Sequence, residues 1–237
     1  MTELPPLTTL VATRKALHRV AEHVLSAARK TATGHIGLVP SPGGFRTPPY
    51  TAADGDRVVA VNGTDIEVRT SSGVRREPLT TVRAAATLAG IEPGFPWTTH
   101  PPATPVEPDD PLAVDAAAAQ VLAGWFALGA EALARLARTA MDDQPGPAQI
   151  YPEHFDLGVV IGAVNYGVSP GDEAIPLPYL YVGPHDGVPA ADAFWNASFG
   201  AYVTIEQVGS VEDASAFFEK GRRLLRETTA IERPTPS

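Results

Sequence analysis

Prolines crowd one stretch in the middle of the chain, EPGFPWTTHPPATPVEPDDP, where seven of them lie between Pro93 and Pro111. Proline has no backbone N–H and a fixed φ, so this stretch can form neither the interior of a helix nor a central strand. We therefore expect residues 92–111 to form an extended connector. The connector divides the chain into two halves, 9–91 and 112–230.

The first half carries a helix signal and a hairpin signal. From Thr9 to Lys30 apolar residues recur every three or four positions, which predicts an amphipathic helix ended by Gly34. The segment HIGLV then predicts a short strand, and PSPGGFRTPPY is rich in turn residues. Asn62-Gly63 between alternating apolar residues predicts a β-hairpin, and a short helix is expected from Thr80 to Ala89.

The second half opens with a longer predicted helix, from Asp115 to Ala140, whose apolar stripe includes Trp125 and Leu128. We expect this stripe to pack on the strand face that carries Phe155, Leu157 and Val203, because that arrangement buries both apolar surfaces. Strands and a final helix are predicted at 155–164, 180–182, 199–205 and 212–228.

Helices and hairpin-forming strands in this order predict a single α+β domain over residues 9–230, with flexible ends at 1–8 and 231–237. Its mostly antiparallel sheet should have helices packed on one face. The strings HIGL and HFDL, and SPGGF and SPGDE, also suggest two similar halves built by duplication. Chance explains the same strings in a chain with 24 prolines and 21 glycines, so both explanations stay open.

Composition narrows the class of protein. The net charge is -9 and basic residues form no cluster, which disfavours nucleic acid and anionic lipid as partners. No apolar run approaches the roughly 20 residues of a membrane helix. The chain has no cysteine and no leader-like start, so we expect a cytoplasmic protein. Phosphate-binding glycine motifs are also lacking, and we predict no cofactor.

The stretch YPEHFDLGVVIG, residues 151–162, places Glu153, His154 and Asp156 at the start of a strand. Because alternate strand side chains point to opposite faces, Phe155 should face the core while His154 and Asp156 share the open face. This cluster could form an acid/base pair or part of a metal site. It could equally hydrogen-bond to loop backbone, and the sequence leaves both readings open; we predict no metal.

Aromatic residues of later strands can share that open face. In the strand 199–205, Phe199 should lie on the core side, with Tyr202 and Glu206 on the other. If the open face is a binding site, His154 and Asp156 should line a concavity with at least one tyrosine. The ligand-binding candidates on these strands are Tyr179, Tyr181, Tyr202 and Glu206.

Two motifs that suggest catalysis have simpler explanations. GVSPG, residues 167–171, matches the serine-hydrolase pattern G-x-S-x-G, but Pro170 has no N–H for an oxyanion hole, so we interpret it as a loop. His18 and Glu22 are four residues apart on the first helix, but they lack the zinc-protease arrangement H-E-x-x-H. We interpret this pair as a solvated contact between neighbouring helical turns.

The ordered segments ALHRVAEHV, VDAAAAQVLAGWFAL, HFDLGVV, PLPYLYV and AFWNASFGAYVTIEQV occur along nearly the whole chain. In this order the chain resembles the uncharacterised bacterial proteins catalogued as domain of unknown function 5996. The most specific elements are His154 to Leu157 and Phe194-Trp195; the family has a longer stretch between the His and the Asp, and often Asp in place of Asn196. The resemblance implies a shared fold but no activity. Trp195 and Asn196 are further ligand-binding candidates.

Two functions follow as hypotheses. The first is a module that binds a small molecule or a protein partner through the open polar face of the sheet. The alternative is a hydrolase-like or metal-assisted enzyme that uses His154 with Asp156 or Glu153.

Overall fold

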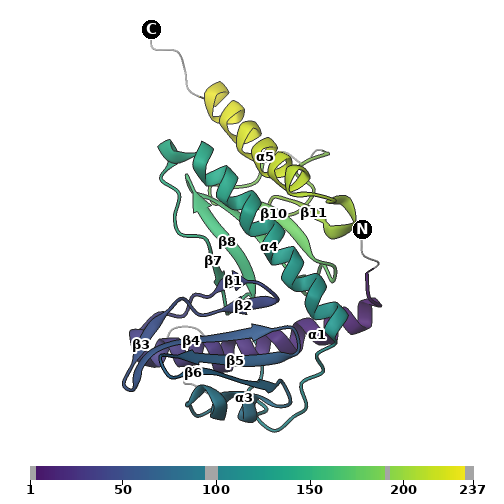
Figure 1. Ribbon diagram of the computed structural model, residues 1–237. Coiled ribbons are helices and arrows are strands. Elements are labelled where there is room, and N and C mark those ends of the chain that lie inside the picture. The colour runs from purple at the N-terminus through teal and green to yellow at the C-terminus, as the bar shows by residue number, and fades with distance from the viewer. Residues whose placement is uncertain (1–3, 94–100, 190–192, 233–237) are drawn as a thin grey trace.

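The computed structural model describes residues 4–93, 101–189 and 193–232, arranged as Figure 1 shows. The chain forms an α+β fold with antiparallel sheets, which confirms the predicted fold class. It has two sheets where the sequence predicted one, because each half of the chain pairs its own strands.

The predicted first helix is a continuous helical segment with a π-helical turn inside it. Its parts are α1 (Leu7–Val20), the π turn η1 (Ala21–Ser26) and α2 (Ala27–Thr33). Gly34 ends it with a φ of 80°, as the sequence predicted. Because α1 begins at Leu7, the last two residues of the stretch expected to be flexible are helical; residues 1–3 lie outside the described residues.

The first sheet is built by residues 39–78. Its strands are β1 (Val39–Ser41), β2 (Gly44–Arg46), β3 (Tyr50–Ala52), β4 (Gly55–Asn62), β5 (Asp65–Thr70) and β6 (Gly73–Pro78). The predicted hairpin is confirmed: β4 and β5 pair Asn62 with Asp65, and Gly63 in the turn has a φ of 61°. The predicted strand HIGLV is mostly wrong, since β1 begins only at Val39 and belongs to a hairpin formed by the supposed turn region.

The second sheet is a meander of consecutive strands. They are β7 (Gln149–Tyr151), β8 (Asp156–Ile161), β9 (Val164–Ser169), β10 (Tyr179–Pro184) and β11 (Ala201–Thr204). The sequence missed β9 and extended β8 too far. Gly162 and Ala163 both have positive φ and form a tight turn that lacks an Asn-Gly signal. Part of the supposed loop at 167–171 is therefore strand.

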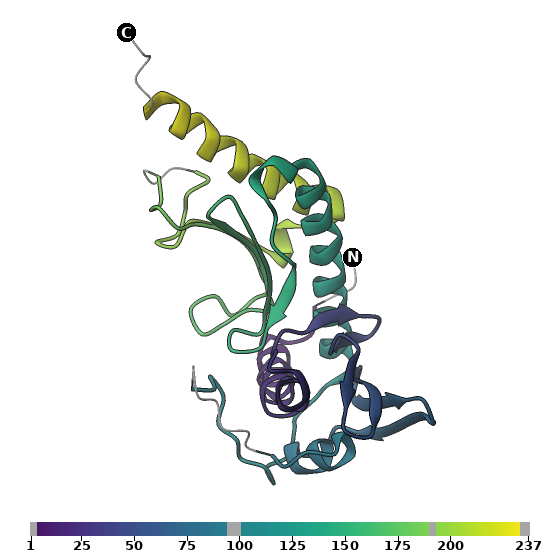
Figure 2. The same ribbon diagram turned by 90° about the vertical axis from the view of Figure 1, so that its left-hand side faces the viewer.

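The remaining helices are α3 (Val82–Ala89), α4 (Ala116–Thr139) and α5 (Val211–Glu232), with short 3-10 turns η2 (Met141–Asp143) and η3 (Ile205–Gln207). Residues 233–237 of the expected flexible tail lie outside the described residues. Figure 2 shows α4 and α5 on one side of the sheet β7 to β11, with loops on the other side. Helices therefore cover one face of this sheet, as predicted.

The core lies between α4 and the second sheet. On β8, Leu157, Val159 and Ile161 are at most 3% exposed, which confirms the predicted core face. The sequence predicted Trp125 and Leu128 as the helix residues that pack on this face. In the structure Phe126 of α4 contacts Phe155, with ring centroids 5.6 Å apart. The indole Nε1 of Trp125 donates to the Ser169 carbonyl on β9, 2.9 Å away.

Helix α4 is long and apolar enough to cross a membrane by length and composition, which the sequence reading had overlooked. Half of its most apolar window is buried, and it packs on α1, α5, β8 and β9. The core helix of a water-soluble α+β domain has the same properties. It is the one helix of this kind in the described part of the chain.

The two halves share one hydrophobic core. Leu38 and Ile150 form a β-bridge between them, and the rings of Phe45 and Phe155 lie 5.2 Å apart. Residues 101–111 of the connector form neither helix nor regular strand, and 94–100 lie outside the described residues. The strand orders of the two sheets differ, and duplication stays a prediction.

Candidate functional site

The turn before β8 sets the direction of His154 and Asp156. The N–H groups of His154 and Phe155 both donate to the Tyr151 carbonyl, and Phe155 takes a φ of 54°. Its ring is 1% exposed and is held in the core by Phe45, by Phe126 and by the stacked ring of His18. With Phe155 anchored, its neighbours in the chain point away from the core.

Asp156 is bound by a tyrosine from two strands away. The Tyr181 hydroxyl on β10 donates to Oδ2 of Asp156, while Oδ1 is buried without a hydrogen-bond partner. The intervening strand permits this contact because Gly167 lies between them: a Cβ there would be 2.2 Å from the Tyr181 ring. The side chain of Tyr181 thus lies across β9, in space that glycine leaves open.

Burial raises the pKa of Asp156, and the hydrogen bond from Tyr181 and the nearby His154 act in the opposite direction. Burial also raises the pKa of Tyr181 well above its ordinary value, and the Asp156 charge adds to that effect. The Tyr181 hydroxyl therefore keeps its proton at neutral pH and remains a donor to the carboxylate.

A second tyrosine and carboxylate pair lies beside the first. The Tyr179 hydroxyl donates to Oδ2 of Asp172 at 2.6 Å, and burial raises the pKa of Tyr179. Oδ1 of Asp172 accepts two backbone N–H groups, from Ala174 and Ile175, each at 2.7 Å. The carboxylate of Asp172 is thus saturated by its own loop and by Tyr179.

These side chains line one cavity of about 550 Å³ over the open face of the sheet. It brings together four of the predicted site residues, namely His154, Asp156, Tyr179 and Tyr181. The ring of Tyr202 packs against Tyr179 at 5.9 Å, at the edge of the same group. The expected concavity over this face is present.

The other predicted candidates lie elsewhere. Trp195 is 4% exposed and packs against Phe194, with ring centroids 4.9 Å apart. Asn196 pairs through its amide with the backbone N–H and carbonyl of Tyr202. Glu206 is exposed in η3 and lines a depression beside α4. Glu153 lines a cavity between the β8 turn and α1.

Sequence reasoning missed Phe199 and Asp172, which line the cavity. The prediction that Phe199 faces the core is wrong: it is 41% exposed, and its ring lies 6.5 Å from those of Tyr179 and Tyr181. Gly200 interrupts the alternation with a φ of 144°, so Phe199 turns to the open side. Gly200 was the sequence feature that could have shown the direction of Phe199. No feature of the sequence marks Asp172 as a residue of the cavity.

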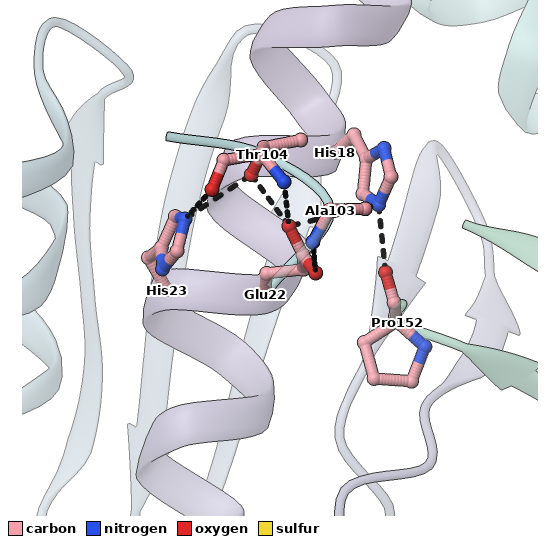
Figure 3. Close-up of polar contacts among 6 residues, drawn as sticks. All are labelled: His18, Glu22, His23, Ala103, Thr104 and Pro152. Carbon is pink, nitrogen blue, oxygen red and sulfur yellow. Dashed lines mark hydrogen bonds and ion pairs between the residues drawn. The ribbon is translucent and has the colours of Figure 1, made fainter. Parts of the chain in front are cut away.

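A separate polar cluster joins α1 and η1 to the connector (Figure 3). Glu22 is 1% exposed and accepts hydrogen bonds from Ala103 N, Thr104 N and Thr104 Oγ1, at 2.5–2.8 Å. Nε2 of His23 donates to the Thr104 carbonyl at 3.0 Å. The interpretation of His18 and Glu22 as a solvated contact is therefore wrong, because the connector folds over this side of the helix.

His18 links the same helix to the site. Its Nε2 donates to the Pro152 carbonyl at 2.8 Å, and its ring stacks on Phe155 at 5.3 Å (Figure 3 shows the first contact). The turn that aims His154 and Asp156 is therefore supported by α1 as well as by α4.

We expect His18 to make stability depend on pH. Burial lowers its pKa, although the neighbouring Glu22 opposes the change. A histidine whose pKa in the folded state is below its ordinary value of about 6.5 makes its full contribution to stability above about pH 6.5. That contribution is lost as the pH falls through the pKa of the folded state. The stability difference between wild type and His18→Gln should therefore shrink below about pH 6.5 in urea melts. His35→Gln removes an exposed imidazole and is the matched control; a difference that is constant with pH would contradict the expectation.

In the described residues, no group of three or more His, Asp or Glu side chains is arranged to hold a metal ion. Comparison of the chain with models of protein families, with curated proteins and with solved structures found no match.

Proposed function

We propose that this protein is a cytoplasmic module that binds a small molecule in the cavity over the open face of the sheet β7 to β11. The observation that carries the proposal is Oδ1 of Asp156, which is buried, lacks a hydrogen-bond partner and belongs to a residue that lines the cavity. An unsatisfied buried polar group costs about 1–3 kcal/mol, so a ligand in the cavity that donates a hydrogen bond to Oδ1 would recover part of that free energy.

The walls of the cavity support the same proposal. Ligand sites combine apolar and aromatic walls with a few convergent polar groups, and here Tyr179, Tyr181 and Phe199 surround Asp156 and His154. Because Gly167 has no Cβ, the side chain of Tyr181 can occupy the space above it. Asp156, Tyr179 and Tyr181 stand on the strands β8 and β10, which favours a defined ligand geometry at these side chains.

Binding is favoured over the enzyme alternative by the state of Asp156, whose carboxylate is already engaged by the Tyr181 hydroxyl. Glu153 and His154 both line the second cavity, beside Arg14 and Arg19, so proton transfer by that pair would act there and not over the open face of the sheet. We also propose that the chain belongs to the family catalogued as domain of unknown function 5996. Its partner is a small molecule rather than nucleic acid or a membrane.

The test is a thermal-shift screen of a metabolite library on wild type and on the double variant His154→Gln, Asp156→Asn. The amides keep the shape of the side chains but remove charge and acid/base capacity, so the variant should stay folded while it loses the shift given by wild-type hits. Glu206→Gln is the matched control, because Glu206 lines the depression on the helix side. Hits that stabilise the double variant as much as wild type, or a screen without any hit, would refute the proposal.

A further inference from the structure

The cavity lining contains donors, on residues such as Asn165 and Ser198, as well as acceptors, and its tyrosine and carboxylate groups are paired with each other. The hydroxyl protons of Tyr181 and Tyr179 are used on Asp156 and Asp172. The carboxylate of Asp172 is already saturated by two backbone N–H groups and Tyr179. What is left unsatisfied is Oδ1 of Asp156, which can only accept while the carboxylate is ionised.

The aromatic rings around this acceptor form a group. The centroids of Tyr179, Tyr181, Phe199 and Tyr202 lie 5.9–6.5 Å apart in five contacting pairs. The face of an aromatic ring carries negative potential and attracts a cation placed over it. A carboxylate oxygen beside several such faces is a favourable position for positive charge.

The charged residues that line the cavity also favour a positively charged ligand. Its described lining includes two carboxylates, Asp156 and Asp172, and two histidines, but no lysine or arginine. Arg14 approaches Asp172 from outside the cavity, since it donates to the Pro176 carbonyl and its charge interacts with Asp172. Asp156 therefore faces the cavity without a permanent cation beside it.

On the basis of the proposed function, we propose that the ligand is a small organic cation with at least one N–H, a primary or secondary ammonium. Its N–H donates to Oδ1 of Asp156, and its adjoining carbon atoms lie against Tyr181 and Phe199. A neutral sugar is the competing class, because aromatic walls with polar groups also suit sugars. The sugar is disfavoured because the unsatisfied atom belongs to a carboxyl group with no lysine or arginine beside it in the described cavity lining, and a cationic donor stabilises the ionised form of such a group best.

The test uses calorimetric titration with three probes of matched shape, 2-phenylethylammonium, 2-phenylethanol and phenylacetate, together with glucose. The ammonium should bind in a saturable manner, and the alcohol and the carboxylate should bind at least about tenfold more weakly. Asp156→Asn should reduce affinity for the ammonium about tenfold or more. Phe199→Ala, at a side chain exposed enough to tolerate it, should reduce the affinity about two- to fivefold.

Asp142→Asn is the control, since it removes one exposed negative charge from η2, outside the cavity lining, and should leave affinity unchanged. Circular dichroism checks that each variant is folded. If Asp156→Asn is not folded, the affinity of Phe199→Ala for the ammonium still tests the proposal. Binding of the alcohol, phenylacetate or glucose that is weakened by Phe199→Ala, without binding of the ammonium, would overturn the ligand class and leave the proposed function standing. Failure of every probe and of the metabolite library would overturn both.

Discussion

Replacement of Trp125 by alanine is expected to lower the free energy of unfolding by about 3–5 kcal/mol, the usual range for emptying a large aromatic site. Trp125 is 2% exposed and lies where α4 meets β9. Loss of its indole also removes the hydrogen bond to the buried end of β9, at the Ser169 carbonyl. Denaturant melts at neutral pH measure the change.

Two further variants interpret that result. Trp125→Phe keeps most of the ring volume but not the N–H. It should therefore avoid most of the destabilisation that the cavity in Trp125→Ala causes. Leu128→Ala, one turn along α4 at a half-buried position, is the matched control and should lower stability less than Trp125→Ala. A loss below about 1 kcal/mol for Trp125→Ala would show that this indole is peripheral to the core.

Replacement of Glu22 by alanine is expected to destabilise the protein by about 3 kcal/mol or more. The carboxylate is almost fully buried and satisfies two backbone N–H groups and one hydroxyl of the connector. Its removal leaves these donors without an acceptor, and leaving a buried donor unsatisfied costs more than a typical hydrogen bond contributes. Denaturant melts measure the loss of stability, and hydrogen exchange at Ala103 and Thr104 should show faster exchange of their amides.

The control is a nearby glutamate that makes an exposed contact. Glu107 forms an ion pair with Arg19 at 3.7 Å, and its side chain is 51% exposed, so Glu107→Ala should change stability by less than about 1 kcal/mol. Glu22→Gln retains one acceptor oxygen and should fall between the two. If Glu22→Ala leaves both stability and amide exchange unchanged, the connector is not held by this cluster.

The π-helical turn explains why this glutamate is placed where it is. Both Glu22 and His23 lie in the turn Ala21–Ser26, and both reach the segment 103–104 (Figure 3). A π turn widens the helix locally and changes which side chains share a face. The spacing of four residues between His18 and Glu22 therefore says little about their exposure.

Part of the candidate site was predictable. Alternation along 155–161 placed Phe155 and Leu157 in the core and Asp156 on the open face, and the structure agrees. The contact between Asp156 and Tyr181 was not predictable, because it depends on β9, which the sequence reading left out, and on Gly167 within it. Phe199 was assigned to the wrong face because alternation was extended through Gly200.

The sequence by itself determined the features that depend on neighbours in the chain. These are the helix end at Gly34, the hairpin at Asn62-Gly63, the proline-rich connector and the core face of β8. Each follows from backbone geometry over a few residues. The tertiary structure alone decided which distant segments meet: Tyr181 with Asp156, the connector with Glu22, and Phe199 with the tyrosines. Local periodicity specifies the direction of a side chain relative to its own element, but what lies in that direction depends on how the elements pack.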